Sequence, residues 1–341
     1  MFIKPLSIYR WIGLIFALVM GIVLLRQIWT LFPVSPKCNE EMQLYLLPLR
    51  LIILVNSKNN HFEKRMAVRE TWGNRTLIES FAGEGFVRGP FFVIARSEEG
   101  LPTNETQQLE REKKQFNDIL EVNEPEDYNR LTPKILEAFK WVEKEIEKWK
   151  KEDNHLSSQD DSYYIWKTDD DVYIHLYRII KIFYNDFRMY QTRKKLVDKT
   201  FYCHLIPHGK IVRDKKKPFY VPYSVIPQYH YPIYCSGIAI AFDSKMLPTI
   251  IDTSNLMMDP LSIVVDDAFF TGLVAEKLEI QRKQIPNKEY YRQVDSWDSQ
   301  TLCDAGAGNE DEGHLILHHV SESQMKFIHK CFLKCWKMIE I

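Results

Sequence analysis

The chain has 341 residues, of which 45% are hydrophobic and 13% are aromatic. This length suffices for one large domain or two small ones with an ample core, and the composition excludes a disordered or low-complexity protein. The 45 basic residues nearly balance the 46 acidic ones, so the charge does not indicate nucleic-acid binding, and we expect no nucleic acid partner.

An apolar segment lies near the N-terminus, behind a short basic stretch. Trp11 to Leu25 is uncharged but shorter than the roughly 20 residues that a spanning helix needs. Extension through Arg26 to Phe32 gives 22 residues, about 33 Å at helical rise. A cleaved signal peptide is the alternative, but small residues suited to cleavage do not follow Leu25. We therefore predict a cytoplasmic tail (1–10), a signal-anchor transmembrane helix (11–32), a short stem (33–47) and a lumenal domain (48–341).

Two further features agree with a lumenal domain. Asn74-Arg75-Thr76 and Asn104-Glu105-Thr106 match the acceptor pattern for N-glycosylation. The six cysteines suit an oxidising compartment, and the sequence leaves their pairing open. Because the basic residues before the apolar segment stay cytosolic, we expect a single-pass type II membrane protein.

The first element of the domain is a strand followed by a helix. Residues 46–55 form a near-continuous apolar run, typical of a central parallel strand covered on both faces, with pairing expected after Pro48. A polar turn then leads to a helix over residues 62–72, on which Arg65 and Arg69 share one face. A strand, turn and helix in this order is a phosphate-binding layout, although these arginines could equally be surface charges.

The next elements repeat this alternation. We predict a strand over residues 90–95 and a charged helix over residues 105–120. Thr132, followed by Pro133, is the expected N-cap of a long amphipathic helix. The apolar stripe of that helix consists of Ile135, Phe139, Val142, Ile146 and Trp149. Alternating strands and helices predict an α/β domain with a parallel sheet.

Three consecutive aspartates follow, inside an apolar run over residues 163–174. A solvated acidic turn is the simpler interpretation, but core-like residues flank the aspartates on both sides. Uncompensated burial of these charges would cost several kcal/mol each, so we predict a divalent metal. Asp169 and Asp171 point the same way if the chain stays extended there.

The second half of the chain is less regular. Residues 229–243 are strand-like around Gly237, and a helix is expected from Val264 towards Leu278. Asp266 and Asp267 precede this helix. They could serve as N-capping residues, or as a sheltered pair containing a general base.

A late strand is expected over residues 315–320. It contains His318 and His319, of which one must face inward, either as a buried neutral histidine or as a third metal ligand. The lysines at 215–217 lie in an expected loop, where they are either solvated or part of a lid over an anionic ligand.

Six sequence blocks occur in an order that resembles one enzyme family. They are Arg65 to Trp72 (RMAVRETW), Asp118-Ile119-Leu120 with Asp127-Tyr128, Leu131-Thr132 and Lys134, Lys167 to Val172 (KTDDDV), Tyr231 to Gly237 (YPIYCSG), Asp266-Asp267 with Thr271-Gly272, and His318 with Gln324-Met325. The chain resembles the β-1,3-galactosyltransferase-like glycosyltransferases of family 31. These include β-1,3-N-acetylglucosaminyltransferases and relatives of Fringe.

The resemblance implies a GT-A fold, in which helices flank a Rossmann-like central sheet. It also implies an inverting enzyme of the Golgi membrane, dependent on Mn²⁺. The reaction would move a hexose or N-acetylhexosamine, with galactose favoured, from a UDP-sugar to a hydroxyl of a glycan acceptor on a glycoprotein or glycolipid. Carried over by position, the residues would be Asp267 as catalytic base; Arg65, Arg69, Lys134, Asp169 and Asp170 at the donor; Tyr231, Pro232, Gly237 and Asp266 at the sugar and acceptor pocket; and Asp171, Asp169 and His318 at the metal.

The chain departs from the family pattern directly after Gly237. The family has further glycine and an aromatic residue there, where this chain has Ile238-Ala239-Ile240. The departure affects the sugar side of the predicted pocket and removes no proposed catalytic group.

Two other functions use the same residues. A lumenal glycoside hydrolase could use Asp171 and Asp267 as its acid and base. A membrane-anchored carbohydrate-binding protein could use a metal at the aspartates without catalysis. The helix with Arg65 and Arg69 argues against both, because neither function needs a phosphate site.

Overall fold

The structure, a computed structural model, describes residues 50–82, 87–96, 104–152, 163–180, 199–261, 264–285, 291–294, 297–307 and 314–335. In these ranges no helix is both long and apolar enough to cross a membrane. The predicted cytoplasmic tail, transmembrane helix and stem lie outside the described residues and remain predictions.

A mixed central sheet organises the domain, with strand order β3-β2-β1-β4-β7-β6-β8. Its strands are β1 (Arg50–Asn56), β2 (Val87–Ile94), β3 (Ile119–Glu121), β4 (Tyr163–Asp169), β6 (Thr200–Ile206), β7 (Tyr234–Asp243) and β8 (Gln281–Gln284). The pairs β3–β2, β2–β1 and β1–β4 are parallel. Strand β7 runs antiparallel to both β4 and β6, and β8 runs parallel to β6. The predicted α/β class and its parallel first half are therefore confirmed.

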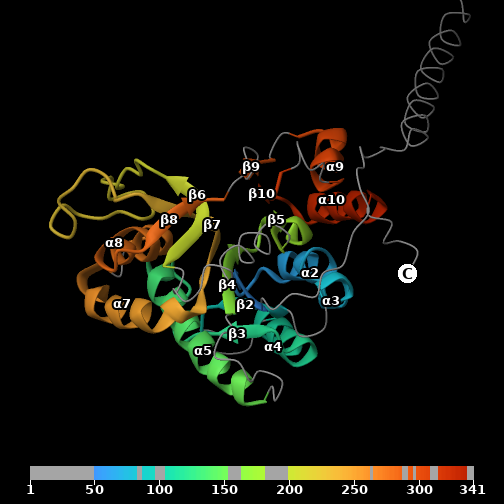
Figure 1. Ribbon diagram of the computed structural model, residues 1–341, viewed down its shortest axis with the longest axis horizontal. Helices are drawn as coiled ribbons and strands as arrows, with labels where there is room; N and C mark the ends of the chain where they lie inside the picture. Colours follow the sequence, from blue (N-terminus) through green and yellow to red (C-terminus); the bar gives the residue numbers. More distant parts are fainter. Residues whose placement is uncertain are drawn as a thin grey trace, which may run out of the picture.

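Helices cover both faces of this sheet (Figure 1). They are α2 (Phe62–Glu70), α3 (Arg75–Ala82), α4 (Asn104–Phe116), α5 (Leu131–Glu152), α7 (Leu247–Leu261), α8 (Ala275–Lys277), α9 (Ser299–Ala307), α10 (Glu322–Cys335), the 3₁₀ helices η1 (Tyr128–Arg130) and η2 (Ser244–Met246), and the π-helix η3 (Ala268–Val274). A second sheet consists of β5 (Val172–Ile174), β10 (Ile316–His318) and β9 (Tyr291–Gln293), in the order β5-β10-β9.

Strand β1 shows how the core is divided. Leu51, Ile53 and Val55 face a cluster that includes residues of α2, α3 and α10. Ile52 and Leu54 face the opposite cluster, which includes the apolar stripe of α5. The period-2 alternation of strand side chains thus supplies two cores from one continuous apolar run.

Several predicted helix boundaries are wrong, and two of these errors have a clear structural reason. The predicted helix over residues 105–120 ends at Phe116, because Asn117 adopts a left-handed φ of 51° and Ile119 begins β3. Thr132 does not cap α5, which already begins at Leu131. The Thr132 side chain is buried instead, and its hydroxyl donates to the carbonyl of Val264. This bond ties α5 to the segment that carries Asp266 and Asp267.

Two disulfides define pairings that the sequence left open. Cys203–Cys235 joins β6 to β7, and Cys303–Cys331 joins α9 to α10. Cys335 is also disulfide-bonded. The first bridge bears on the candidate site, because Cys235 lies two residues before Gly237.

Candidate functional site

A cleft of about 410 Å³ opens at the carboxyl ends of β1 and β4. The last residues of these strands, Asn56 and Asp169, are paired in register and both line the cleft. In open α/β sheets ligands bind at such an edge, where strand order changes. The start of β7, the segment before η3 and the end of β10 also line it. One cleft therefore gathers the aspartate triplet, the Asp266–Asp267 pair and the late histidines.

The aspartate triplet does not stay extended. Strand β4 ends at Asp169, and the next two aspartates form a turn that leads into β5 of the other sheet. The three carboxylates consequently have different surroundings. The Asp169 carboxylate accepts hydrogen bonds from Asn56 Nδ2 at 3.3 Å and Lys167 Nζ at 3.5 Å. Burial raises the pKa of Asp169 to about 6, although Lys167 opposes this shift.

Asp170 is held entirely by neighbouring side chains. Its Oδ2 lies 2.7 Å from both Ser57 Oγ and His61 Nδ1, and its Oδ1 lies 3.6 Å from Lys64 Nζ. Burial raises the pKa of Asp170, but His61, Lys64 and Ser57 outweigh it, so the pKa lies below its usual value. This carboxylate fixes the turn between β1 and α2.

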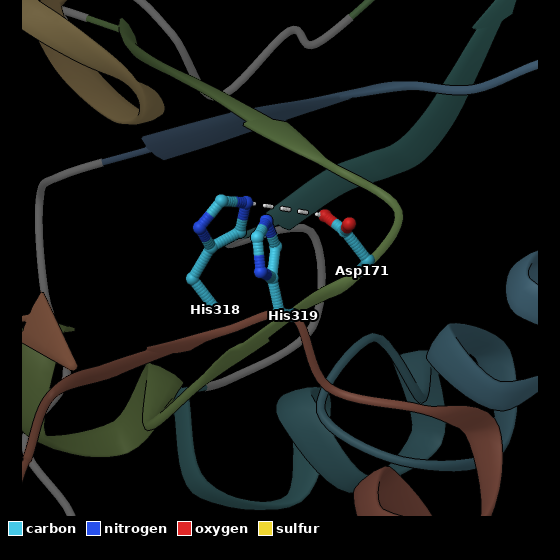
Figure 2. Close-up of side chains that lie close together, drawn as sticks. All are labelled: Asp171, His318 and His319. Atoms are coloured by element: carbon cyan, nitrogen blue, oxygen red, sulfur yellow. Dashed lines mark ion pairs between the residues drawn. The ribbon is translucent and has the colours of Figure 1, made fainter. Parts of the chain in front are cut away.

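Asp171 lies beside two histidines. Ligand atoms of Asp171, His318 and His319 all lie within 4.8 Å of one another, and Asp171 Oδ1 is 3.6 Å from His318 Nε2. Figure 2 shows both imidazole rings beside the carboxylate. The sequence predicted that one of the two histidines faces inward, but His318 is half-buried, His319 is exposed, and both reach Asp171. Strand β10 ends at His318, and His319 has a left-handed φ of 57°, which breaks the alternation of side chains.

This trio fits a divalent metal ion. One carboxylate oxygen and two imidazole nitrogens are ligands that first-row divalent metals accept. Asp171 and His318 are half-buried and His319 is exposed, and all three line the cleft, so further positions would face a ligand there. Asp169, also predicted as a metal ligand, lies outside this cluster. Although the sequence analysis considered both histidines, it placed only His318 at the metal.

In the Asp266–Asp267 pair, as in the aspartate triplet, neighbouring carboxylates have different partners. Asp266 Oδ2 forms an ion pair with Lys167 Nζ at 3.0 Å, and Lys167 also donates to the Gly237 carbonyl at 3.1 Å. Asp267 instead accepts from backbone N–H groups, at 3.0 Å from Gly237 and 2.6 Å from Ala268. Burial and the adjacent Asp266 raise the pKa of Asp267 to about 7, against the opposing effect of Lys167.

Hydrogen bonds fix this pair against β7. Thr271 Oγ1 accepts from the Cys235 N–H at 2.8 Å and donates to the Asp267 carbonyl at 2.6 Å. Thr271 belongs to the π-helix η3, a rare geometry that is frequent at functional sites. The sequence contained no signal for a π-helix, although it did place a helix here.

The two predicted donor-binding arginines do not line the cleft. Arg65 is fully buried, with nitrogens 2.8 and 2.6 Å from the oxygens of Glu112. Arg69 is 2.7 Å from Glu112 and also binds Asp118 through two bonds, at 2.8 and 2.7 Å. Arg65 further donates to the carbonyls of Lys58 and Asn59. The Arg65 guanidinium therefore supports the turn between β1 and α2 from behind, whereas that of Arg69 joins α2 to α4 and to the residue before β3.

Other basic side chains line the cleft wall instead. Lys58, His61 and Lys64 line it, and sequence reasoning missed them because they lie in an unremarkable polar turn and on a charged helix. Lys134, which was predicted, lines the cleft and donates to the Ser57 carbonyl at 2.7 Å. Burial lowers the pKa of Lys134.

The remaining predicted residues divide between the cleft and its surroundings. Gly237 and Asp266 line the cleft, whereas Tyr231 and Pro232 do not. Tyr231 is buried, with its ring centroid 5.9 Å from that of Tyr234. Burial, followed by the nearby Asp267 charge, raises the pKa of Tyr231 to about 12.

The predicted glycosylation sites lie on other elements. The Asn74 side chain accepts from the Leu77 N–H at 3.0 Å at the start of α3. Asn104 is exposed and begins α4.

Comparison with known proteins identifies the family. The sequence model described as Galactosyltransferase matches residues 63–286, about two thirds of the chain. The chain therefore belongs to the galactosyltransferase family, a family of glycosyltransferases, as the sequence blocks indicated.

Individual relatives agree with this assignment. The chain is 25% identical to mouse beta-1,3-galactosyltransferase 5 over 244 residues, which cover 72% of this chain and 68% of the relative. It is 26% identical to human beta-1,3-galactosyltransferase 1 over 230 residues, covering 67% and 61% respectively. For a lactosylceramide 1,3-N-acetyl-beta-D-glucosaminyltransferase of Xenopus tropicalis the identity is 25% over 247 residues, with coverage of 72% and 57%. The match thus spans less than two thirds of the length of the last two relatives.

Proposed function

We propose that this chain is an inverting, metal-dependent β-1,3-glycosyltransferase. It transfers a hexose or N-acetylhexosamine, with galactose favoured, from a UDP-sugar to a hydroxyl of a glycan on a glycoprotein or glycolipid. The observation that carries the proposal is that the Asp171, His318 and His319 trio and the carboxylate of Asp267 line the same cleft. The names of the family and of the relatives supply the reaction class.

The donor would occupy the cleft between the metal trio and the basic wall. Lys58 and Lys64 offer cationic groups to a diphosphate, and His61 adds an imidazole that is oriented by Asp170, which itself accepts from Ser57. Asp171, His318 and His319 would hold the ion. When bound, a Mn²⁺ ion would offset the charge on the departing diphosphate.

Asp267 would act as the general base. Its carboxylate accepts the proton of the acceptor hydroxyl while that oxygen bonds to the anomeric carbon of the sugar. The bond from this carbon to the diphosphate oxygen breaks on the opposite face, so UDP leaves and the configuration inverts. Gly237 and Ala268 N–H groups hold the carboxylate in place. Because its pKa lies near 7, a large fraction of Asp267 is ionised at neutral pH.

The same proposal covers fold and location. Helices on both faces of a mixed sheet support a GT-A arrangement with a Rossmann-like core. The apolar segment at 11–32 and the disulfides support a type II protein of the Golgi membrane, with Asn74 and Asn104 glycosylated. Family membership disfavours the glycoside hydrolase and the non-enzymatic carbohydrate-binding protein.

A donor panel tests this proposal. The full-length chain, purified in detergent, is incubated with Mn²⁺, simple galactoside and N-acetylglucosaminide acceptors, and UDP-galactose, UDP-N-acetylglucosamine or UDP-N-acetylgalactosamine. We expect transfer from at least one donor, loss of transfer with EDTA, and recovery on adding Mn²⁺. NMR of the product should show a β-1,3 linkage. Absence of both transfer and donor hydrolysis with every donor would contradict the proposal.

A further inference from the structure

A long loop, residues 207–233, connects β6 to β7 and projects from the sheet (Figure 1). Backbone hydrogen bonds close it at its base. The Ile211 N–H donates to the Tyr229 carbonyl at 3.1 Å, and the Tyr231 N–H donates to the Gly209 carbonyl at 2.9 Å. The loop is therefore ordered, and its first and last segments are hydrogen-bonded to each other.

Arg213 cross-links the interior of this loop. Its guanidinium donates to the carbonyls of Val221 at 2.6 Å and Ile226 at 2.7 Å, and also to that of Gln228. The same group lies 4.0 Å from the ring centroid of Tyr223. This cation–π contact fixes the ring on the loop. The ring therefore loses less conformational entropy when a ligand binds.

Two aromatic rings on this loop face solvent. Tyr223 is 51% exposed and Tyr229 is 72% exposed, and their centroids lie 5.9 Å apart with the planes at 77°. Exposed apolar groups gathered on a rigid support mark binding surfaces more often than scattered ones do. The two tyrosines therefore form a small, preorganised aromatic surface.

The loop also reaches the cleft. Phe219 lines it with a left-handed φ of 61°, which is an outlier for a bulky residue and costs roughly 1–2 kcal/mol. Such strain is concentrated at functional sites. At its far end the loop runs into β7, where Gly237 binds the carboxylate of Asp267. One continuous segment thus joins the tyrosine pair, the cleft and the proposed base.

We propose that Tyr223 and Tyr229 form a stacking surface for the sugar rings of the acceptor glycan. The apolar C–H face of a pyranose packs on an aromatic ring, while its hydroxyls stay hydrated. A glycan fits this surface better than a protein, because a stable protein interface buries about 800 Å² per partner. Apart from Tyr223 and Tyr229, the large hydrophobic side chains exposed in the described part of the chain are Ile233, also on this loop, and Leu256 on α7. The inference rests on the proposed function, which supplies the acceptor.

Tyr229→Ala is the first test, because the side chain is exposed and its backbone bonds survive the change. The full-length chain in detergent is assayed with lactose, N-acetyllactosamine and chitobiose, both as acceptors and immobilised for binding with Mn²⁺ and UDP. We expect the acceptor KM to rise about tenfold, with donor KM and melting temperature unchanged. Tyr229→Phe should stay within about twofold of the wild type, since it keeps the aromatic face.

The matched control is Leu256→Ala, which truncates an 83% exposed side chain on α7. It should leave the acceptor KM unchanged. An unchanged KM in Tyr229→Ala and in the double variant with Tyr223→Ala would overturn the stacking surface, as would failure of the wild type to bind any of the three glycans. If the wild type bound glycans through the tyrosines but transferred no sugar, the proposed function would fail and the stacking surface would stand.

Discussion

The two aspartate clusters of the cleft share one arrangement. In each, one carboxylate is paired with a lysine, and the carboxylate of the next residue stays open to a ligand in the cleft. Asp170 is held by His61 and Lys64 beside Ser57, next to Asp171. Asp266 is held by Lys167, next to Asp267. Adjacent acidic residues in the sequence are therefore divided between structural and chemical tasks.

The carboxylates that stay open to the ligand, Asp171 and Asp267, have different neighbours. Asp171 meets two imidazole rings from the end of β10, a set that suits a metal ion. Asp267 accepts from two backbone N–H groups and lies beside a second carboxylate, and burial followed by that carboxylate raises its pKa, which suits proton transfer. The neighbours from other elements, and not the acidic run itself, decide which chemistry each cluster can perform.

Removal of the proposed base should have the largest effect. We expect Asp267→Asn to lower kcat by roughly 10²–10⁴-fold, because the amide cannot accept the acceptor proton. Binding of UDP with Mn²⁺, measured by calorimetry, should stay within about threefold. Asp252→Asn on the exposed surface of α7 is the matched control and should have normal turnover. Near-normal turnover of Asp267→Asn would show that another group is the base.

The pH dependence of the wild type sharpens this prediction. Because Asp267 must be ionised to act, and its pKa is raised to about 7, activity should fall as the pH falls below 7. We expect kcat/KM for the acceptor to drop about tenfold per pH unit there, with a slope of one proton. A profile that is flat down to pH 5 would contradict the assignment.

Separate substitutions of Asp171 and Asp170 test the comparison at the proposed metal site. Asp171→Asn should weaken Mn²⁺-dependent UDP binding at least about tenfold while the melting temperature is unchanged, because this half-buried carboxylate faces the cleft. Asp170→Asn should instead lower the stability of the fold and leave Mn²⁺-dependent UDP binding largely intact. It loses charge-assisted bonds to buried Ser57 and half-buried His61, so the free energy of unfolding should fall by about 1–3 kcal/mol.

Isothermal titration and urea unfolding of the two variants provide the measurements. Equal losses of stability in both would mean that the division into held and open carboxylates is mistaken. A Mn²⁺ affinity unchanged in Asp171→Asn would exclude this carboxylate from the metal site.

The elements and their general positions could be predicted from the sequence. The apolar run of β1, the stripe of α5 and the apolar flanks of the aspartate triplet each determine a local structure and a buried face. The carboxyl ends of neighbouring strands meet at one edge of a sheet, so the clustering of the candidate residues followed. These are local patterns, which one stretch of sequence carries in full.

The partners of each charge could not be predicted in the same way. Arg65 and Arg69 share a helical face after a strand, as expected, but Glu112 and Asp118 neutralise them from α4 and the turn after it. No sequence pattern near α2 indicates that these distant carboxylates are the partners of its arginines. His319 was similarly unpredictable, because a left-handed residue at a strand end reverses the direction of one side chain without a glycine to signal it.

His319 provides the smallest and most specific test. Both His319→Gly and His319→Ala remove the second imidazole, so each should lower Mn²⁺ affinity several-fold, measured by titration with UDP present. They should differ in stability, because glycine adopts a φ of 57° freely whereas alanine does not. We expect His319→Gly to be more stable than His319→Ala by about 1 kcal/mol in urea unfolding. His318→Ala, at a strand position with ordinary φ, should lower Mn²⁺ affinity at least as much. If the Mn²⁺ affinity of His319→Gly equals that of the wild type, the left-handed turn serves the backbone alone, and the metal trio reduces to Asp171 and His318.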